Sequence, residues 1–182
     1  MRKQDFLSGF YSAWATAWGP MGAVAGPDGL RRVILPNYQV DELFQLLAWD
    51  HPKCIRDDKP FERLTELSRD YFNGKPVDFG AIPCDLPDEG SFSGKVLRAC
   101  RAIPYGRKMT YSSLAGQIGC PESARAVGTA LGKNPIPLVV PCHRVVNASG
   151  GMSGFSAPGG INLKRRMLEL ERKASGTGGA QG

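Results

Sequence analysis

The residues with the clearest capacity for chemistry lie together in the second half of the chain. Cys142 is followed directly by His143 and Arg144, and the apolar segment 136–140 precedes them as an expected buried strand. A cysteine attacks as its thiolate, and a neighbouring base or cation makes that thiolate easier to form. A lone cysteine is more often an inert core residue. Because His143 is one of only two histidines in the chain, its place beside Cys142 keeps a nucleophilic interpretation open beside the structural one.

The composition limits the class of protein. The 182 residues carry a net charge of +6, which slightly favours an acidic partner such as nucleic acid. The five cysteines are odd in number and show no zinc-knuckle spacing, so a reduced, cytoplasmic location is expected. No apolar run approaches the roughly 20 residues that span a membrane, and residues 1–10 lack the apolar core of a secretory signal. His51 and Cys54 make at most half a zinc site, so we predict no metal.

The first half of the chain indicates a small sheet covered by helices. Apolar segments at 11–18 and 22–35 are typical of strands, and Gly, Pro and Asp at 26–29 indicate a turn between antiparallel partners. Apolar residues recur at helical spacing in 40–49 and again in 61–72. We therefore predict an N-terminal domain over residues 11–80, with two amphipathic helices packed on an antiparallel sheet.

The second half indicates a helical domain over residues 91–173, reached through a linker at 73–90 that is rich in Gly, Pro and Asp. Its first helix should end before Pro104, with Cys100 as a core residue.

A helix capped by Thr110 should end at Gly119, and Pro121 should open the next one, which favours a helix-turn-helix or a plain helical hairpin. A last helix is expected over 164–172. Residues 174–182 have no apolar anchor and should form a disordered tail.

Short motifs in this second half resemble one known family, the methylated-DNA-protein-cysteine methyltransferases, which move an alkyl group from O6 of guanine onto their own cysteine. The motifs are IPYG at 103–106, TY at 110–111, RAVG at 125–128, NP at 134–135, PCHRV at 141–145, Gly154, and residues 164–171. Residues 71–79 match more loosely. The resemblance implies an α/β (α+β) fold, with a small ribonuclease-H-like N-terminal domain containing an antiparallel sheet and a helical C-terminal domain containing a winged-helix-like helix-turn-helix.

The resemblance also implies the catalytic roles. Cys142 would accept the alkyl group, and Glu171 would orient His143 so that a water molecule takes the thiol proton. Asn134 would brace the turn that carries the cysteine. Without the resemblance, Glu171 would be a solvated carboxylate at a helix end, and Asn134 would be a helix C-terminal residue that tolerates left-handed geometry.

The remaining implied roles concern DNA. Arg125 would enter the base stack while the alkylated nucleotide rotates out, and Tyr111 would contact the guanine ring. Further substrate or DNA contacts are expected from small residues beside Arg125 and from residues around the cysteine: Ser123, Ala124, Ala126, Gly128, Val145, Phe155, Ser156 and Lys164. From the residues alone, Tyr111 packs against its neighbours and the small side chains allow tight helix contacts.

The implied partner is double-stranded DNA containing O6-alkylguanine, bound by a monomer without any cofactor, with O4 of thymine as a second candidate atom. Phe155 stands where the family often has tyrosine, and the loop at 156–160 is longer than in some members. These two differences leave open which alkyl groups the protein accepts. Two other functions fit the residues. One is a non-catalytic module that binds alkylated DNA or has a regulatory role, and the other is a cysteine hydrolase that uses Cys142 and His143.

Overall fold

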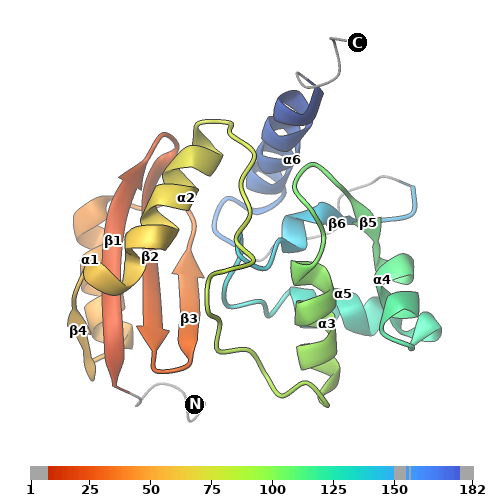
Figure 1. Ribbon diagram of the computed structural model, residues 1–182, viewed down its shortest axis with the longest axis horizontal. Coiled ribbons are helices and arrows are strands. Elements are labelled where there is room, and N and C mark those ends of the chain that lie inside the picture. The colour runs from red at the N-terminus through yellow and green to blue at the C-terminus, as the bar shows by residue number, and fades with distance from the viewer. Residues whose placement is uncertain (1–7, 150–154, 156, 177–182) are drawn as a thin grey trace.

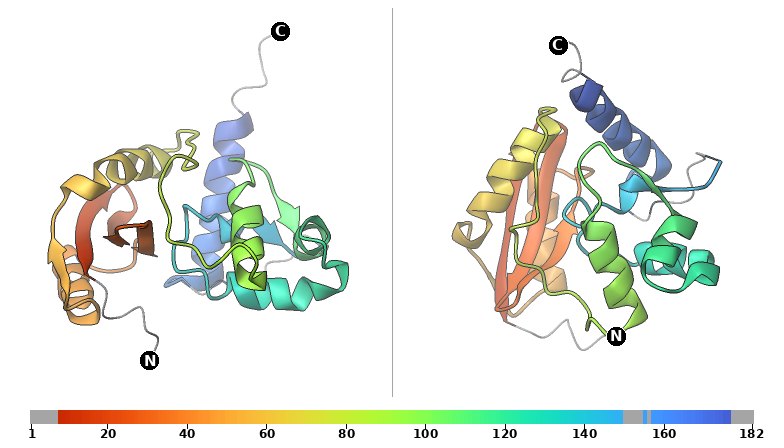
Figure 2. Two further views of the ribbon diagram at one scale, coloured as in Figure 1. Left: turned by 60° about the horizontal axis from the view of Figure 1, so that its bottom comes forward. Right: turned by 45° about the vertical axis from the view of Figure 1, so that its right-hand side comes forward.

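Figure 1 shows the computed structural model of the chain, which describes residues 8–149, 155 and 157–176. A sheet with two helices forms the N-terminal half, and a mainly helical C-terminal half packs beside it (Figures 1 and 2). The mixed α/β class predicted from the sequence is confirmed. The winged-helix detail stays a prediction.

The N-terminal sheet has four strands in the order β3-β2-β1-β4. Their bounds are β1 (Gly9–Thr16), β2 (Gly19–Gly26), β3 (Gly29–Ile34) and β4 (Cys54–Arg56). The first three form the antiparallel meander that the sequence predicts, and Gly29 closes the second hairpin with φ +120°, a conformation open mainly to glycine. Strand β4 was not predicted, and it pairs parallel to β1. The sheet is therefore mixed rather than purely antiparallel.

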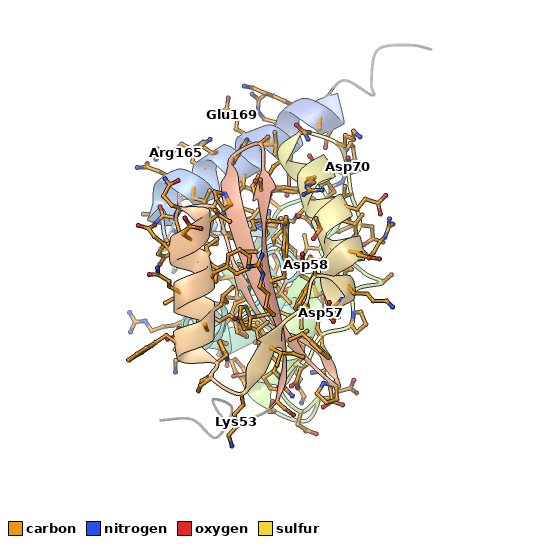
Figure 3. The ribbon with its side chains drawn as sticks, turned by 90° about the vertical axis from the view of Figure 1, so that its left-hand side faces the viewer. Lys53, Asp57, Asp58, Asp70, Arg165 and Glu169 are labelled. Carbon is orange, nitrogen blue, oxygen red and sulfur yellow. The ribbon has the colours of Figure 1, made fainter. Side chains whose placement is uncertain are left out.

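Two helices cover opposite faces of this sheet, α1 (Val40–Asp50) and α2 (Glu62–Phe72), which follows a 3-10 turn, η2 (Lys59–Phe61). Side chains alternate along β2, because successive residues of a strand point to opposite faces. Met21 and Ala23 pack with the α2 side, whereas Val24 packs with α1. Figure 3 shows this end of the molecule, with α1 and α2 flanking the strands. Both amphipathic helices predicted from the sequence are confirmed.

The linker at 73–90 has no helix or long strand, as predicted, but it is held against the sheet. The Leu30 amide donates to the Pro83 carbonyl at 2.9 Å, and the Asp85 amide donates to the Leu30 carbonyl at 2.9 Å. Arg101 donates to carbonyl groups of the linker, including Ile82 at 2.5 Å. One hydrophobic cluster contains side chains from both halves of the chain. The domain boundaries therefore stay predictions.

The C-terminal half contains α3 (Phe92–Arg101), β5 (Met109–Thr110), α4 (Tyr111–Gln117), η3 (Pro121–Ser123), α5 (Ala124–Leu131), η4 (Cys142–Arg144), β6 (Val145–Val146) and α6 (Gly160–Gly176). The Thr110 hydroxyl accepts the Ser113 amide at 3.0 Å, which confirms the predicted N-cap. Gly119 has φ +76° in the turn between α4 and η3. Pro121 opens a 3-10 turn, and the α-helix begins only at Ala124.

Helix α6 is longer than predicted at both ends. It begins at Gly160 and ends at Gly176, so residues 174–176 continue the helix instead of starting a disordered tail. The Ser175 hydroxyl donates to the Glu171 carbonyl at 2.8 Å, a contact within the last turns that composition does not reveal. The rest of the predicted tail, 177–182, lies outside the described residues. In the part of the chain that the structure describes, no helix is long and apolar enough to cross a membrane.

Candidate active site

The segment before Cys142 is buried, as expected, but it is a tight turn rather than a strand. The Val140 amide donates to the Ile136 carbonyl at 3.0 Å, and Leu138 has φ 77°, the only positive φ among the described residues other than glycine. Prolines at 135, 137 and 141 lack the amide hydrogen that a strand ladder requires. The prolines therefore override the apolar pattern that indicated a strand.

Asn134 holds this turn closed and also contacts the cysteine. Its side-chain amide donates to the Val140 carbonyl at 2.8 Å and to Sγ of Cys142 at 3.2 Å, while its oxygen accepts the Ile136 amide at 3.1 Å. Helix α5 ends earlier, at Leu131, so Asn134 is not the left-handed helix terminus expected from the residues alone. Its position agrees with the bracing role implied by the family resemblance.

Cys142 is a buried thiol with donors directed at its sulfur. Burial raises the pKa of Cys142, whereas the hydrogen bond from Asn134, the charge of Lys164 and nearby backbone amides lower it. Hydrogen bonds and positive charge favour the thiolate over the thiol. The side chain therefore rests as a thiol in a site that would stabilise the thiolate once a base has removed the proton.

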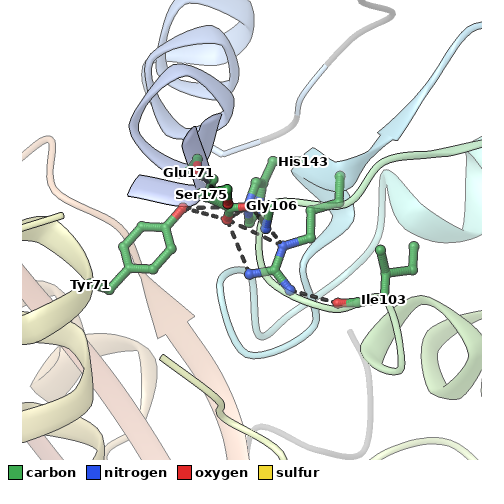
Figure 4. Close-up of polar contacts among 7 residues, drawn as sticks. Tyr71, Ile103, Gly106, His143, Glu171 and Ser175 are labelled. Carbon is green, nitrogen blue, oxygen red and sulfur yellow. Dashed lines mark hydrogen bonds and ion pairs between the residues drawn. The ribbon is translucent and has the colours of Figure 1, made fainter. Parts of the chain in front are cut away.

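His143 and Glu171 form a buried pair, with Nε2 of the imidazole 2.7 Å from Oε1 of the carboxylate (Figure 4). Burial lowers the pKa of His143 although Glu171 raises it, so the ring is neutral near pH 7. A neutral ring beside a carboxylate carries its hydrogen on Nε2 and donates it. The buried Nδ1 has no hydrogen-bond partner among the described residues. That nitrogen is therefore free to accept a proton.

The Glu171 carboxylate is almost fully enclosed and accepts several hydrogen bonds. Arg144 donates to it through Nε at 3.0 Å and Nη2 at 3.1 Å, Tyr71 through its hydroxyl at 2.9 Å, and the Gly106 amide at 3.0 Å. Burial alone would raise the pKa of Glu171, but His143 and Arg144 lower it to about 2. Glu171 is therefore an ionised group that orients His143 and does not itself take up a proton.

Two members of this cluster, Arg144 and Tyr71, were not predicted as site residues. In the sequence, Arg144 stands out only as a neighbour of the cysteine, and Tyr71 falls within the helical pattern of residues 61–72. Arg144 is buried and also donates to the Ile103 carbonyl at 2.6 Å, which ties it to the IPYG segment. A buried carboxylate requires a cation or several donors. If Glu171 is expected to be buried in the protein, this requirement identifies Arg144 as its partner.

Several of the predicted DNA-contact residues line one hollow of the C-terminal half. A hollow of about 420 Å³ is lined by Tyr111, Ser112, Ala124, Arg125, Gly128, Asn147 and Ala148. Arg125 and Ala126 are exposed, and Ser123 is partly exposed beside them. A Cβ at Gly128 would lie 3.7 Å from the Tyr111 ring. Helices α4 and α5 with the turn between them thus present small side chains, the Tyr111 ring and the exposed Arg125 on a common surface, and the choice between a helix-turn-helix and a plain helical hairpin stays a prediction.

The other predicted contact residues lie near the cysteine. Lys164 is buried, and its ammonium donates to the Val145 carbonyl at 2.7 Å and lies 5.9 Å from the centre of the Tyr111 ring. It can therefore act on a substrate only from inside the site and not from the outer surface. Phe155 and Cys142 line one cavity of about 390 Å³, whose far wall includes β3 and α1. Ser156 lies outside the described residues.

Within the described ranges, no group of three or more His, Cys, Asp or Glu side chains is placed to hold a metal ion. His51, half of the partial zinc site considered from the sequence, lies 3.3 Å from Nη1 of Arg32.

Comparison with known proteins places this chain in a family. The family described as "6-O-methylguanine DNA methyltransferase, DNA binding domain" matches residues 91–173. A methylated-DNA–protein-cysteine methyltransferase of Mycobacterium tuberculosis is 44% identical over 116 residues, covering 64% of this chain and 68% of the relative. One from Metallosphaera sedula is 41% identical over 140 residues, covering 75% and 86%.

A solved structure gives the same result. The crystal structure of Mycobacterium tuberculosis OGT in complex with DNA is similar to this chain with a TM-score of 0.72 and 34% identity, covering 91% of this chain and 94% of that one. A buried cysteine beside a histidine–carboxylate pair is the arrangement of proteins that react through a thiol. The chain belongs to the methylated-DNA–protein-cysteine methyltransferase family.

Proposed function

We propose that the protein repairs DNA directly by transferring an alkyl group, methyl in the simplest case, from O6 of guanine to Sγ of Cys142. The observation that carries this proposal is the position of the thiol. Its sulfur accepts a hydrogen bond from Asn134, and the neighbouring His143 has a neutral ring with an unpartnered Nδ1. The family membership and the DNA complex of the similar Mycobacterium tuberculosis structure support it.

In the proposed reaction, the thiol proton passes through a water molecule to Nδ1 of His143, and Glu171 stabilises the resulting imidazolium. The thiolate attacks the alkyl carbon, so an S–C bond forms as the C–O6 bond breaks. The electron pair of that bond stays on the purine, which takes one proton and becomes ordinary guanine. Asn134 and Lys164 stabilise the sulfur anion before the attack.

We assign DNA binding to the helix-turn-helix surface around Tyr111 and Arg125. Chemistry at O6 of a paired base requires that the nucleotide leave the stack. Arg125 is exposed beside small residues that permit close approach to a groove. The Val145 carbonyl, already paired with Lys164, keeps one lone pair for a base amino group. Phe155 would border the alkyl group in the cavity beside Cys142.

The test is to incubate the protein with an excess of duplex DNA containing labelled O6-methylguanine. We expect one methyl group per protein molecule, located on Cys142 by mass spectrometry, and unmodified guanine in the DNA. Release of product well beyond one equivalent would indicate a turning-over hydrolase instead. Tight binding without label on the protein would indicate the non-catalytic module.

The role of Arg125 leads to a separate prediction. Arg125→Ala should slow transfer from duplex DNA by about 10-fold or more, because extrusion of a stacked base costs a few kcal/mol, but should leave transfer from free O6-methylguanine base unchanged. The measurement is the single-turnover rate on both substrates. Arg63→Ala is the matched control, since it removes the same charge from an exposed position on α2. Equal losses on both substrates would refute extrusion by Arg125.

We place the protein in the cytoplasm as a monomer. All five cysteines are free thiols, which fits a reducing compartment.

A further inference from the structure

We propose that Tyr71 is a positioning residue of the transfer reaction, which keeps His143 neutral by sharing the carboxylate of Glu171. This inference rests on the proposed function and adds a residue from the N-terminal half to the proton relay. The Tyr71 hydroxyl donates to Oε1 of Glu171 at 2.9 Å and lies 3.4 Å from Nε2 of His143 (Figure 4).

Oε1 of Glu171 is the atom on which the argument depends. It accepts from Nε2 of His143 at 2.7 Å, from the Tyr71 hydroxyl at 2.9 Å, and from Nη2 of Arg144 at 3.1 Å. Each additional donor spreads the negative charge of this oxygen over another hydrogen bond. The carboxylate then stabilises a positive imidazole less strongly than it would with His143 as its main partner. Tyr71 therefore lowers the proton affinity of His143 without touching the sulfur.

The Tyr71 hydroxyl is fixed in place and remains a donor. Its side chain is fully buried, and its ring packs edge-on against Phe72 at 5.1 Å and Tyr105 at 5.8 Å between centroids. Burial, followed by the negative charge of Glu171, raises the pKa of Tyr71 well above its ordinary value. The hydroxyl therefore keeps its proton near neutral pH and remains a hydrogen-bond donor.

The state of His143 matters because only the neutral ring can accept the thiol proton. Protonation of His143 at low pH blocks the relay, so transfer should decline as the solution becomes acidic. The other charged or titratable groups near the pair come from every neighbouring element: Arg144 on η4, Lys164 on α6, Tyr105 in the loop before β5, Cys142 on η4 and Cys100 on α3. All of them are still present when only the Tyr71 hydroxyl is removed.

The test is the Tyr71→Phe variant, which keeps the ring and removes only the hydroxyl. We expect the acid side of the single-turnover rate profile to move to higher pH by about half to one unit. This is only part of a full hydrogen bond to a charged group, because Tyr71 donates to Glu171 in both protonation states of His143 and only the difference between them moves the pKa of the ring. The rate on the alkaline plateau should stay within a few-fold of the unchanged protein. NMR titration of the His143 ring should show the same upward shift in pKa without DNA.

Tyr105→Phe is the matched control. It removes a hydroxyl from the adjacent ring whose oxygen is buried and has no hydrogen-bond partner among the described residues. Its rate profile should coincide with that of the unchanged protein. A Tyr71→Phe profile and His143 titration that both match the unchanged protein would overturn the role of Tyr71 while leaving alkyl transfer intact. Absence of transfer in the unchanged protein would instead overturn the proposed function.

Discussion

Replacing Cys142 with serine should abolish alkyl transfer, with a rate loss of at least about 1,000-fold, while binding to alkylated duplex DNA persists. A serine hydroxyl is slightly smaller than the thiol and fits the same space, but its much higher pKa prevents His143 from generating an anion. Asn134 and Lys164 would still surround the side chain, so the fold should be little affected. The measurement is a titration of labelled methyl transfer at several protein-to-DNA ratios.

Cys84→Ser provides the control for this titration. Cys84 is a partly exposed thiol in the linker, and its sulfur donates to the Ile82 carbonyl at 3.3 Å. This variant should still accept one methyl group per molecule, because a thioether on Cys142 offers no route for hydrolysis. Methyl transfer to the Cys142→Ser protein, or loss of transfer from Cys84→Ser, would assign the acceptor role to another residue.

The elements that could be predicted from the sequence are those with a sustained period. Helices α1 and α2 repeat apolar residues over about three turns, and the β2–β3 hairpin contains its glycine turn. Strand β4 has only three residues and gains its stability from pairing with β1. The local sequence does not predict this pairing. The segment before Cys142 is as apolar and buried as a strand would be, but its prolines and the left-handed Leu138 close it into a turn.

The site was predictable in part. Cys142 and His143 are adjacent in the sequence, so their chemistry can be inferred from the sequence alone. Glu171 is 28 residues from His143, and only the family resemblance indicated their contact. Tyr71 is 100 residues from Glu171 and belongs to the other half of the chain. A tyrosine at helical spacing is usually a packing residue, and its hydroxyl contact depends on how the halves pack.

Replacing Glu171 with glutamine should damage stability and transfer together. The amide keeps the shape but removes the charge that pairs with Arg144, a guanidinium that is itself buried. Leaving one partner of a buried ion pair alone costs about 3–5 kcal/mol. Transfer should also slow by about 100-fold, because the carboxylate no longer orients His143 or stabilises its protonated form. Urea unfolding and single-turnover rates measure the two effects.

The stability difference should also depend on pH in a defined direction. The pKa of Glu171 is lowered from 4.5 to about 2 in the folded protein. A lowered carboxylate pKa stabilises the fold above pH 4.5, and this contribution disappears as the pH falls toward 2. The free energies of unfolding of the unchanged protein and Glu171→Gln should therefore differ most near neutral pH and converge in acid.

Glu169→Gln is the control for this comparison, because Glu169 is an exposed carboxylate on the same helix, paired with Lys173 at the surface (Figure 3). It should leave both stability and transfer unchanged, since exposed pairs of this kind contribute little. If Glu171→Gln proved as stable and as active as Glu169→Gln at pH 7, the buried carboxylate would have no part in holding Arg144 or in preparing His143.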